Sequence, residues 1–430
     1  MARTVLLAGP ANLEAASMPT RALALLLLLL LLSLPAAAAS REAQTTAQFI
    51  AEHAARHQFS GTILVREGAR TTFRQSFGLA DRAFAVPNTP DTRYKIASIT
   101  KTFTATLILK AVEDGKLALD QPFRTWLPGY TGSGGDSITV HQLLNHTGGL
   151  PNFDTVKDLK TALRSGVPFY QRPYTSDQLM HALCSGAPVN EPGKVFDYNN
   201  ADYIILGKIL EAVHGQPFDR ILAAQILQPL GMPDSGMLRQ QDIVPRLAST
   251  YFARPDLGNA LAPDLPIYPE NGYAAAAMYS TVDDLARFAD ALFDGRVLKS
   301  DSLALMLKPG LDDYGYGAWT YTATFAGQKH HVLKRPGSIM GAQAQFYRVI
   351  EPGVTVIILS NVGNMDLDQF VADIGKRAVA EAQAKRTADC CAVHRSDGHA
   401  GFGLVRRHDR RAAGGHRSAR AQIWRAAIPH

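Results

Sequence analysis

Segments with β-rich sequence lie near the two ends of this 430-residue chain, and the sequence between them is mostly helical in pattern. Near the N-terminal end, Phe59–Val65 and Thr71–Phe77 are joined by Glu67-Gly68, which predicts a β-hairpin. Near the other end, Val354–Ser360 is an almost unbroken apolar run, typical of a strand buried on both faces. Further strands are predicted before it, at Tyr316–Thr322, His331–Lys334 and Ala342–Val349. This placement predicts one sheet built from both ends of the chain, with a mostly helical lobe inserted at about residues 137–265.

Helical periodicity marks the remaining elements. A helix is predicted over Thr45–His57, a strong one from Ser98 to Glu113 that stops at Gly115, and another that Thr281 caps. Within the lobe, the helical segments are His141–Leu144, Ala201–Val213 and Phe218–Ile226, and a final helix is predicted over Leu367–Ala384.

The positive charge of the chain is concentrated behind that final helix. The whole chain has a net charge of +6, but residues 385–430 alone contain ten Lys and Arg against three Asp. Residues 40–384 contain 32 Lys and Arg against 34 Asp and Glu, so this body is close to neutral. We therefore predict one domain at 40–384 and a basic, disordered tail at 385–430. With only Phe402 and Trp424 as aromatic residues, that tail does not favour nucleic-acid binding.

The first 39 residues are typical of a signal peptide. Arg21 precedes the apolar run Ala22–Leu34, Pro35 interrupts it, and Ala36–Ala39 provide a small-residue cleavage site. This largely apolar run of thirteen residues is short for a bilayer span, although an uncleaved anchor is the alternative. The sequence predicts that the mature protein is periplasmic or secreted, with no stable membrane span after cleavage.

The motif Ser98-Ile99-Thr100-Lys101 is the first candidate for chemistry. On a helix, residues three apart share a face, so the amine of Lys101 can approach the hydroxyl of Ser98. A serine hydroxyl needs a neighbouring base to attack an acyl carbon, and a lysine with a lowered pKa can serve. No G-x-S-x-G motif is present, which argues against an α/β-hydrolase.

Two later motifs strengthen this interpretation. Tyr198 and Asn200 lie directly before a predicted helix; a phenol near cations can exchange protons with a serine, and an amide can hold a substrate carbonyl. In the C-terminal part, Arg335-Pro336-Gly337-Ser338 is placed on a strand, where a glycine lets the backbone approach a substrate. The backbone N–H groups of Ser338 and Ser98 are candidates for an oxyanion hole.

With these three motifs in this order, the chain resembles the serine β-lactamase and penicillin-binding protein superfamily, in the branch related to class C β-lactamases. Flanking segments such as Leu143–Pro151 and Ser280–Leu285 also match, and the resemblance covers about residues 47–384. It implies an α+β fold of the β-lactamase/transpeptidase type, with an antiparallel sheet flanked by helices.

The resemblance also implies roles for the site residues. Ser98 would be the acylated nucleophile, Lys101 its proton partner and Tyr198 a general base, with the division of the base role between the last two left open. Asn200, Arg335, Gly337 and Ser338 would bind substrate. The family usually has Lys or His where this chain has Arg335, and arginine can grip a substrate carboxylate with two hydrogen bonds. His146 is expected to be structural.

These observations predict an exported serine hydrolase that acts on a β-lactam, a D-amino-acid peptide or a small ester through an acyl-enzyme. The alternative is a non-catalytic protein that binds penicillin or cell-wall peptides and is acylated without turnover. No metal or cofactor is expected, because the chain has no H-E-x-x-H or C-x-x-C motif. The three cysteines, Cys184, Cys390 and Cys391, do not make a disulfide framework.

Overall fold

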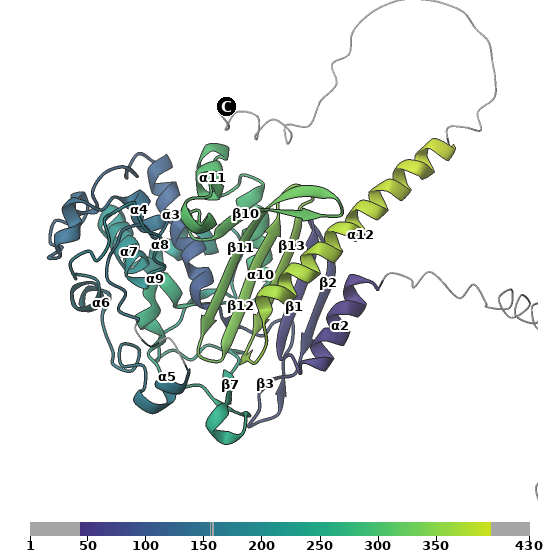
Figure 1. The fold of residues 1–430 in the computed structure, drawn as a ribbon, viewed down its shortest axis with the longest axis horizontal. Coiled ribbons are helices and arrows are strands. Elements are labelled where there is room, and N and C mark those ends of the chain that lie inside the picture. Colours follow the sequence, from purple (N-terminus) through teal and green to yellow (C-terminus); the bar gives the residue numbers. More distant parts are fainter. Residues whose placement is uncertain (1–43, 155, 157–158, 397–430) are drawn as a thin grey trace, which may run out of the picture. The chain divides into compact units, whose positions relative to one another are not determined.

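A computed structural model describes residues 44–154, 156 and 159–396 of the chain. The chain divides into two units, 1–44 and 45–430, and almost all described residues belong to the second (Figure 1). The predicted signal peptide and residues 397–430 lie outside the described residues.

One six-stranded antiparallel sheet organises the second unit, in the order β10-β11-β12-β13-β1-β2. The N-terminal hairpin pairs with the last long strand, since Gly61 lies opposite Ser360 and Glu67 opposite Val354. The prediction of one sheet built from both ends of the chain is therefore confirmed, and so is the α+β class. The strands are β1 (Gly61–Glu67), β2 (Arg70–Phe77), β10 (Trp319–Phe325), β11 (Gln328–Ile339), β12 (Ala342–Val349) and β13 (Val354–Ser360).

Alternating side chains of β13 enter two separate hydrophobic cores. Val356 and Ile358 pack with residues of α2 (Thr46–Arg56) and α12 (Leu367–Ser396) on one face, whereas Ile357 and Leu359 pack on the other. This alternation is the expected geometry of a strand, and burial on both faces explains why the sequence is apolar throughout. Figure 1 shows α12 crossing one face of the sheet.

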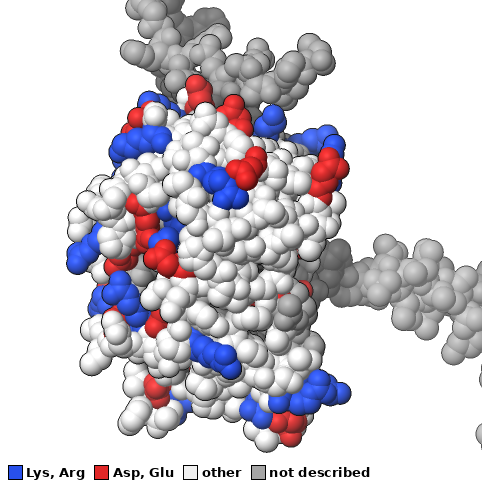
Figure 2. Space-filling model, turned by 90° about the vertical axis from the view of Figure 1, so that its left-hand side faces the viewer, with Lys and Arg blue, Asp and Glu red and all other residues white. Residues whose placement is uncertain are grey.

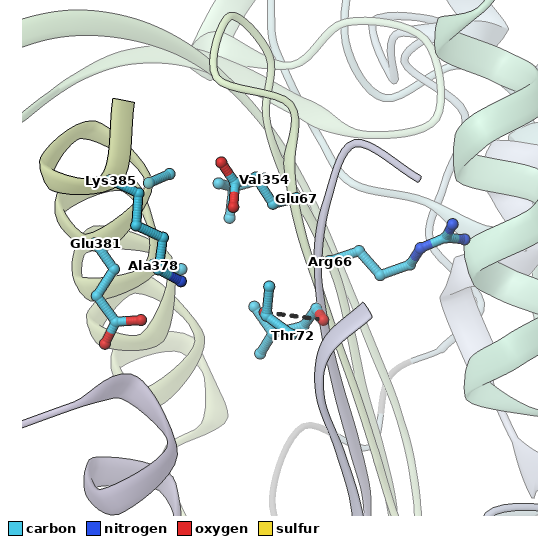
Figure 3. Close-up of a pocket in the computed structure, with 9 residues that line it drawn as sticks. Arg66, Glu67, Thr72, Val354, Ala378, Glu381 and Lys385 are labelled. Carbon is cyan, nitrogen blue, oxygen red and sulfur yellow. Dashed lines mark hydrogen bonds between the residues drawn. The ribbon is translucent and has the colours of Figure 1, made fainter. Parts of the chain in front are cut away.

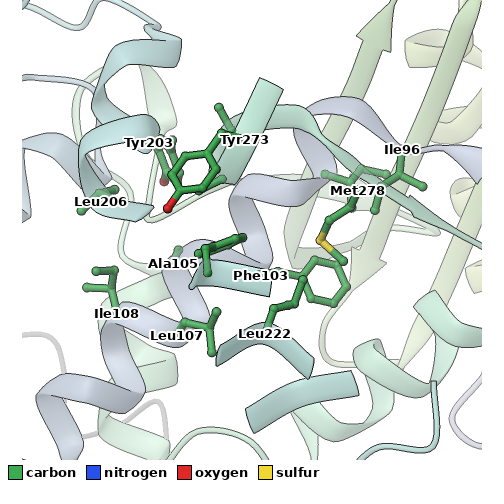
Figure 4. Close-up of a cluster of buried hydrophobic side chains, with 14 of the residues drawn as sticks. Ile96, Phe103, Ala105, Leu107, Ile108, Tyr203, Leu206, Leu222, Tyr273 and Met278 are labelled. Atoms are coloured by element: carbon green, nitrogen blue, oxygen red, sulfur yellow. The ribbon is translucent and has the colours of Figure 1, made fainter. Parts of the chain in front are cut away.

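The second core is centred on α3 (Thr100–Glu113), in which nearly every side chain is buried. Figure 4 shows Phe103 and Leu107 of this helix among apolar side chains from several other elements, including Leu222 and Met278. Each fully buried side chain of this size stabilises the fold by about 1.5–3 kcal/mol. The helix that bears the serine motif is thus the centre of the fold and cannot shift easily.

The inserted lobe supplies a second wall for the site. The predicted helices are confirmed within one or two residues as α4 (Val140–Leu144) and α7 (Asn200–His214), while the third splits into α8 (Phe218–Leu222) and a π-helical turn at Ala223–Leu227. The last part of the lobe contains short strands that were not predicted. The lobe also includes α5 (Leu159–Ser165), α6 (Ser176–Leu183), β6 (Gly236–Met237), β7 (Tyr251–Arg254) and β8 (Ala260–Pro263).

Short elements complete the unit. They are β3 (Leu79–Asp81), β4 (Val86–Pro87), β5 (Tyr94–Lys95), α9 (Tyr273–Ala276), β9 (Met278–Ser280), α10 (Val282–Phe293), α11 (Ser300–Leu307) and β14 (Val362–Gly363). The predicted cap of α10 is present, because the Thr281 side chain accepts a hydrogen bond from the backbone N–H of Asp284.

The final helix is longer than predicted. We expected it to end at Ala384, but α12 continues to Ser396, so the first residues of the predicted tail are helical. Lys385 lines a small hollow between α12 and the sheet, and Arg386 lies 3.7 Å from Glu67. Figure 3 shows this hollow, from which Arg66 points away toward Asp290 on the other face of the sheet. The hollow contains none of the predicted site residues.

The surface of the body agrees with its near-neutral charge. Figure 2 shows one face of the molecule on which basic and acidic side chains are interspersed, without a block of one sign. Among the helices of the described residues, none combines the length and apolar character needed to cross a membrane.

Candidate active site

Ser98 lies in a short 3₁₀ turn, Ala97–Ile99, directly before α3. We predicted it inside the helix, and the difference places it at the N-terminal end of α3. Ala97 has φ of +46°, a left-handed conformation that residues other than glycine seldom adopt. The Thr100 hydroxyl holds this turn by donating to the Ala97 carbonyl over 2.6 Å. Strained backbone of this kind is concentrated at functional sites.

Lys101 lies one turn further along and is completely buried. Its Nζ atom lies 3.2 Å from Ser98 Oγ and donates to Asn200 Oδ1 over 2.7 Å and to the Ala275 carbonyl over 3.2 Å. Burial, together with the positive charge of Arg335, lowers the pKa of Lys101 to about 8. The amine can therefore change its protonation state near neutral pH.

Tyr198 approaches the same serine from the lobe, just before α7. Its hydroxyl lies 2.9 Å from Ser98 Oγ and accepts a hydrogen bond from Nη2 of Arg335. Burial alone would raise the pKa of Tyr198, but the positive charges of Arg335 and Lys101 outweigh burial and lower it to about 8. The phenol is thus prepared to act as a base.

Asn200 begins α7 and connects Lys101 to the lobe. Its Oδ1 accepts from Lys101, and its Nδ2 donates to the hydroxyl of Tyr170 over 3.2 Å. The Tyr170 hydroxyl in turn donates to Asp154 over 3.3 Å. One N–H of the Asn200 amide is thus donated to Tyr170, and the substrate-binding role of Asn200 stays a prediction.

Arg335 lies on β11 and is only 1% exposed. Its Nε donates to the Ser98 carbonyl over 2.7 Å, its Nη1 to the Tyr314 hydroxyl over 3.2 Å and its Nη2 to Tyr198. The sequence led us to expect a guanidinium that grips a substrate carboxylate. Three of the five N–H donors of the guanidinium are thus engaged inside the protein, and its contact with a substrate carboxylate stays a prediction.

Gly337 brings β11 against the nucleophile turn. A Cβ at this position would lie 2.3 Å from the Ile96 carbonyl oxygen and 3.3 Å from the Ser98 nitrogen. Only a glycine therefore permits this approach. Strand β10 pairs with β11 only as far as Lys334, so the segment that contains Pro336 and Gly337 has a free edge on that side. The oxyanion hole from the Ser98 and Ser338 N–H groups stays a prediction.

His146 lies at the end of α4 and is fully buried with Asp202 of α7; its Nδ1 is 2.8 Å from Asp202 Oδ2. The ring centre of His146 is 4.5 Å from that of Tyr198. Burial and the charges of Lys101 and Arg335 hold the pKa of His146 well below its usual value, and burial raises that of Asp202. Both shifts favour the uncharged form of each group, and the His146 ring packs against Tyr198.

Three aromatic residues of the site were not predicted from the sequence. Tyr170 bonds to Asn200, Tyr314 bonds to Arg335, and Trp319 stacks on Tyr198 with ring centres 5.9 Å apart. None belongs to a motif, and their contacts arise only when lobe and sheet meet. A Gly-rich aromatic run, Tyr314-Gly315-Tyr316-Gly317, is the only local signal that could have drawn attention to one of them.

No group of three or more His, Cys, Asp or Glu in the described part of the chain has the arrangement of a metal site. Cys184 is buried and has a free thiol. The site described above is built from a serine, a lysine, a tyrosine and an arginine.

Fold and site together define a serine hydrolase in which a lysine and a tyrosine flank the nucleophile. The comparison with protein families agrees: the beta-lactamase family matches residues 46–381, and the chain belongs to that family.

Individual relatives cover several activities. Esterase EstB of Burkholderia gladioli is 29% identical over 286 residues, which are 59% of this chain and 71% of the esterase. A penicillin-binding protein structure from Bacillus halodurans has a TM-score of 0.63 at 28% identity and covers 75% of this chain and 97% of that one. D-amino acid amidase from Ochrobactrum anthropi SV3, in complex with L-phenylalanine, has a TM-score of 0.65 at 25% identity and covers 79% and 98%.

Proposed function

We propose that this protein is an exported serine hydrolase that cleaves an ester or amide bond through an acyl-enzyme on Ser98. One observation supports it above all others: Ser98 Oγ lies 3.2 Å from Lys101 Nζ and 2.9 Å from the Tyr198 hydroxyl. A hydroxyl held between two groups whose pKa values lie at about 8 can lose its proton as it attacks a carbonyl carbon.

In the proposed reaction, the Tyr198 phenolate takes the proton of Ser98 as Oγ bonds to the acyl carbon. The oxygen of the tetrahedral intermediate becomes negative, and the backbone N–H groups of Ser98 and Ser338 stabilise it. Collapse of the intermediate expels the leaving group, which receives the proton from Tyr198. A water molecule, deprotonated by the same residue, then attacks the acyl carbon; the bond to Ser98 Oγ breaks, Oγ receives that proton from Tyr198, and the acid is released. Lys101 keeps a positive charge beside the phenolate.

We propose three substrate classes: small esters, amides of D-amino acids, and penicillins. They are suggested by the names of three relatives, an esterase, a D-amino acid amidase and a penicillin-binding protein. Export follows from the sequence pattern of residues 1–39. Cell fractionation, with N-terminal sequencing of the mature protein, tests it: a start near Ser40 supports cleavage, and retention in the cytoplasm contradicts it.

The catalytic proposal is tested with the purified full chain and a chromogenic ester, a D-amino acid amide and a penicillin. Turnover that Ser98→Ala abolishes, with an acyl group found on Ser98 by mass spectrometry, supports the hydrolase. Stoichiometric labelling of Ser98 by penicillin without turnover of any substrate supports the non-catalytic binding protein instead. If Ser98 were not labelled and no substrate were turned over, both the hydrolase and the non-catalytic binding protein would be excluded.

A further inference from the structure

The guanidinium of Arg335 is enclosed on every side by groups of the protein. Its three nitrogens donate to the Ser98 carbonyl, the Tyr314 hydroxyl and the Tyr198 hydroxyl. The aromatic rings of Tyr198 and Trp319 lie near it, with ring centres 5.2 Å and 5.4 Å from Cζ. Three of its five N–H donors are used in these contacts, and because the residue is 1% exposed, we expect a substrate carboxylate to reach the group only by displacing one of the two phenols.

That displacement would be costly. The side chain is 1% exposed, and charge-assisted hydrogen bonds in such a place are strong. Desolvation of a carboxylate that enters the site without pairing with a cationic side chain is strongly unfavourable. The contact between Arg335 and Tyr198 also balances a buried positive charge with the ionised form of the phenol. A carboxylate competing for the guanidinium would remove that support from Tyr198.

The neighbouring side chains of β11 do not offer a substrate carboxylate another cation. Side chains alternate along a strand, so Lys334, Pro336 and Ser338 point to the face opposite Arg335 and Gly337. Lys334 demonstrates this directly, because its Nζ lies 3.1 Å from Asp368 of α12. The hydroxyl of Ser338 lies on that same face. This stretch of β11 therefore offers the substrate backbone groups and no free cation.

From this arrangement we infer that Arg335 is a positioning residue for Tyr198, and that the enzyme acts on uncharged esters or amides rather than on substrates that carry a carboxylate beside the scissile bond. The inference rests on the proposed function and narrows its substrate class. It implies that penicillins, which carry such a carboxylate, acylate Ser98 poorly.

Two esters with the same acyl group test the inference in wild-type protein: phenyl acetate and 3-carboxyphenyl acetate. They differ only in a carboxylate on the leaving group. We expect kcat/KM to be at least about tenfold higher for phenyl acetate after correction for the spontaneous hydrolysis of each ester, because the buried guanidinium of Arg335 is already bonded to Ser98, Tyr198 and Tyr314. A preference for 3-carboxyphenyl acetate would overturn the inference.

Variants at adjacent positions separate positioning from substrate binding. A single ammonium cannot bond to three acceptors, so Arg335→Lys should lower kcat/KM for both esters by a similar factor, about 10². The pH at which the rate is half-maximal should also rise. In this variant only the charge at position 335 moves away from the phenol, so the pKa of Tyr198 should rise. The other titratable groups around the phenol stay in place: Lys101, His146, Tyr314 and Tyr203. If Arg335→Lys lowered kcat/KM only for 3-carboxyphenyl acetate, Arg335 would be assigned to substrate binding and the inference would be overturned.

Lys334→Ala is the matched control, since it removes the adjacent cation on the other face of the strand and should leave both esters unchanged. A melting curve of each variant shows whether it folds. If Arg335→Lys does not fold, the ratio of the two kcat/KM values in the wild-type protein still tests the inference. Absence of Ser98-dependent turnover of either ester would defeat the proposed function, whereas Ser98-dependent turnover that favours the charged ester would defeat only this inference.

Discussion

The Nζ atom of Lys101 lies 4.8 Å from the centre of the Tyr198 ring, close enough for the ammonium to stabilise the electron-rich face of the phenol. Arg335 contacts the same ring from another side. Two cations from two different elements thus surround one phenol at the nucleophile. This arrangement explains how an ordinarily weak acid comes to have a pKa of about 8 in a buried site.

The first prediction concerns the pH dependence of acylation. Tyr198 acts as a base only when ionised, so kcat/KM for a neutral ester should rise with pH along a limb with an apparent pKa near 8. Because Tyr198 and Lys101 interact, that value belongs to the pair. Tyr198→Phe should lower kcat/KM by about 10²–10⁴-fold and remove the limb. A Tyr198→Phe profile with an unchanged limb would mean that Lys101 alone is the base.

A second prediction concerns the close approach of β11 to the serine turn. Gly337→Ala would place a Cβ against the Ile96 carbonyl and push the strand away from Ser98. We expect a loss of about 10² in kcat/KM and of about 1–3 kcal/mol in the free energy of unfolding. Ester kinetics and urea denaturation measure the two effects. Gly129→Ala is the control, because a Cβ there meets no atom within 4 Å. Equal effects of both substitutions would contradict the role of Gly337.

The elements that the sequence predicted well are those specified by local pattern. Ala342–Val349 and Val354–Ser360 match the structure at both ends, because their residues form a continuous buried stretch. The predicted interval His331–Lys334 is shorter than β11, which spans Gln328–Ile339, although the motif Arg335–Ser338 was itself placed on a strand. Short strands such as β6 contain too few residues for any period to show.

In the candidate site, too, the residues that belong to local sequence motifs were predicted and the contacts between distant residues were not. Ser98, Lys101 and Tyr198 were found because their spacing within motifs reflects the chemistry, and the structure brings them within hydrogen-bond distance. The environment of Arg335 was not predictable. Its partners Tyr314 and Trp319 are separated from it in sequence and meet it only through the pairing of β10 with β11 and the loop before β10.

A third prediction concerns the C-terminal end of the chain. No motif of the site lies in residues 397–430, so a chain that ends at Ser396 should keep the kcat/KM of the full chain. Truncation after Ala384 removes Lys385 and Arg386, which contact the body, and should lower the melting temperature without changing the substrate ratio. Ester kinetics and melting curves of the two truncated chains test this. A loss of activity in the chain that ends at Ser396 would show that the tail takes part in catalysis.

The last prediction concerns the buried pair behind Tyr198. The backbone N–H of Asn199 donates to Nδ1 of His146 over 3.3 Å, and the same nitrogen lies 2.8 Å from Asp202 Oδ2. Burial and the nearby Asp197 raise the pKa of Asp202 well above its usual value. A carboxyl group whose pKa is higher in the folded state stabilises the fold fully only below its unfolded pKa. That contribution is lost as the pH rises from about 4 toward the folded pKa.

Asp202→Asn keeps a neutral donor at the same place but does not titrate. Its free energy of unfolding should therefore increase relative to wild type as the pH rises above about 4, and its activity on a neutral ester should stay within about tenfold of wild type. Asp202→Ala leaves His146 without its partner and should cost about 1–3 kcal/mol. Urea denaturation between pH 4 and 8 measures these differences. If Asp202→Asn instead lost stability relative to wild type as the pH rose, the carboxyl group would be ionised in the folded protein, and Asp202 would balance the charges of Lys101 and Arg335.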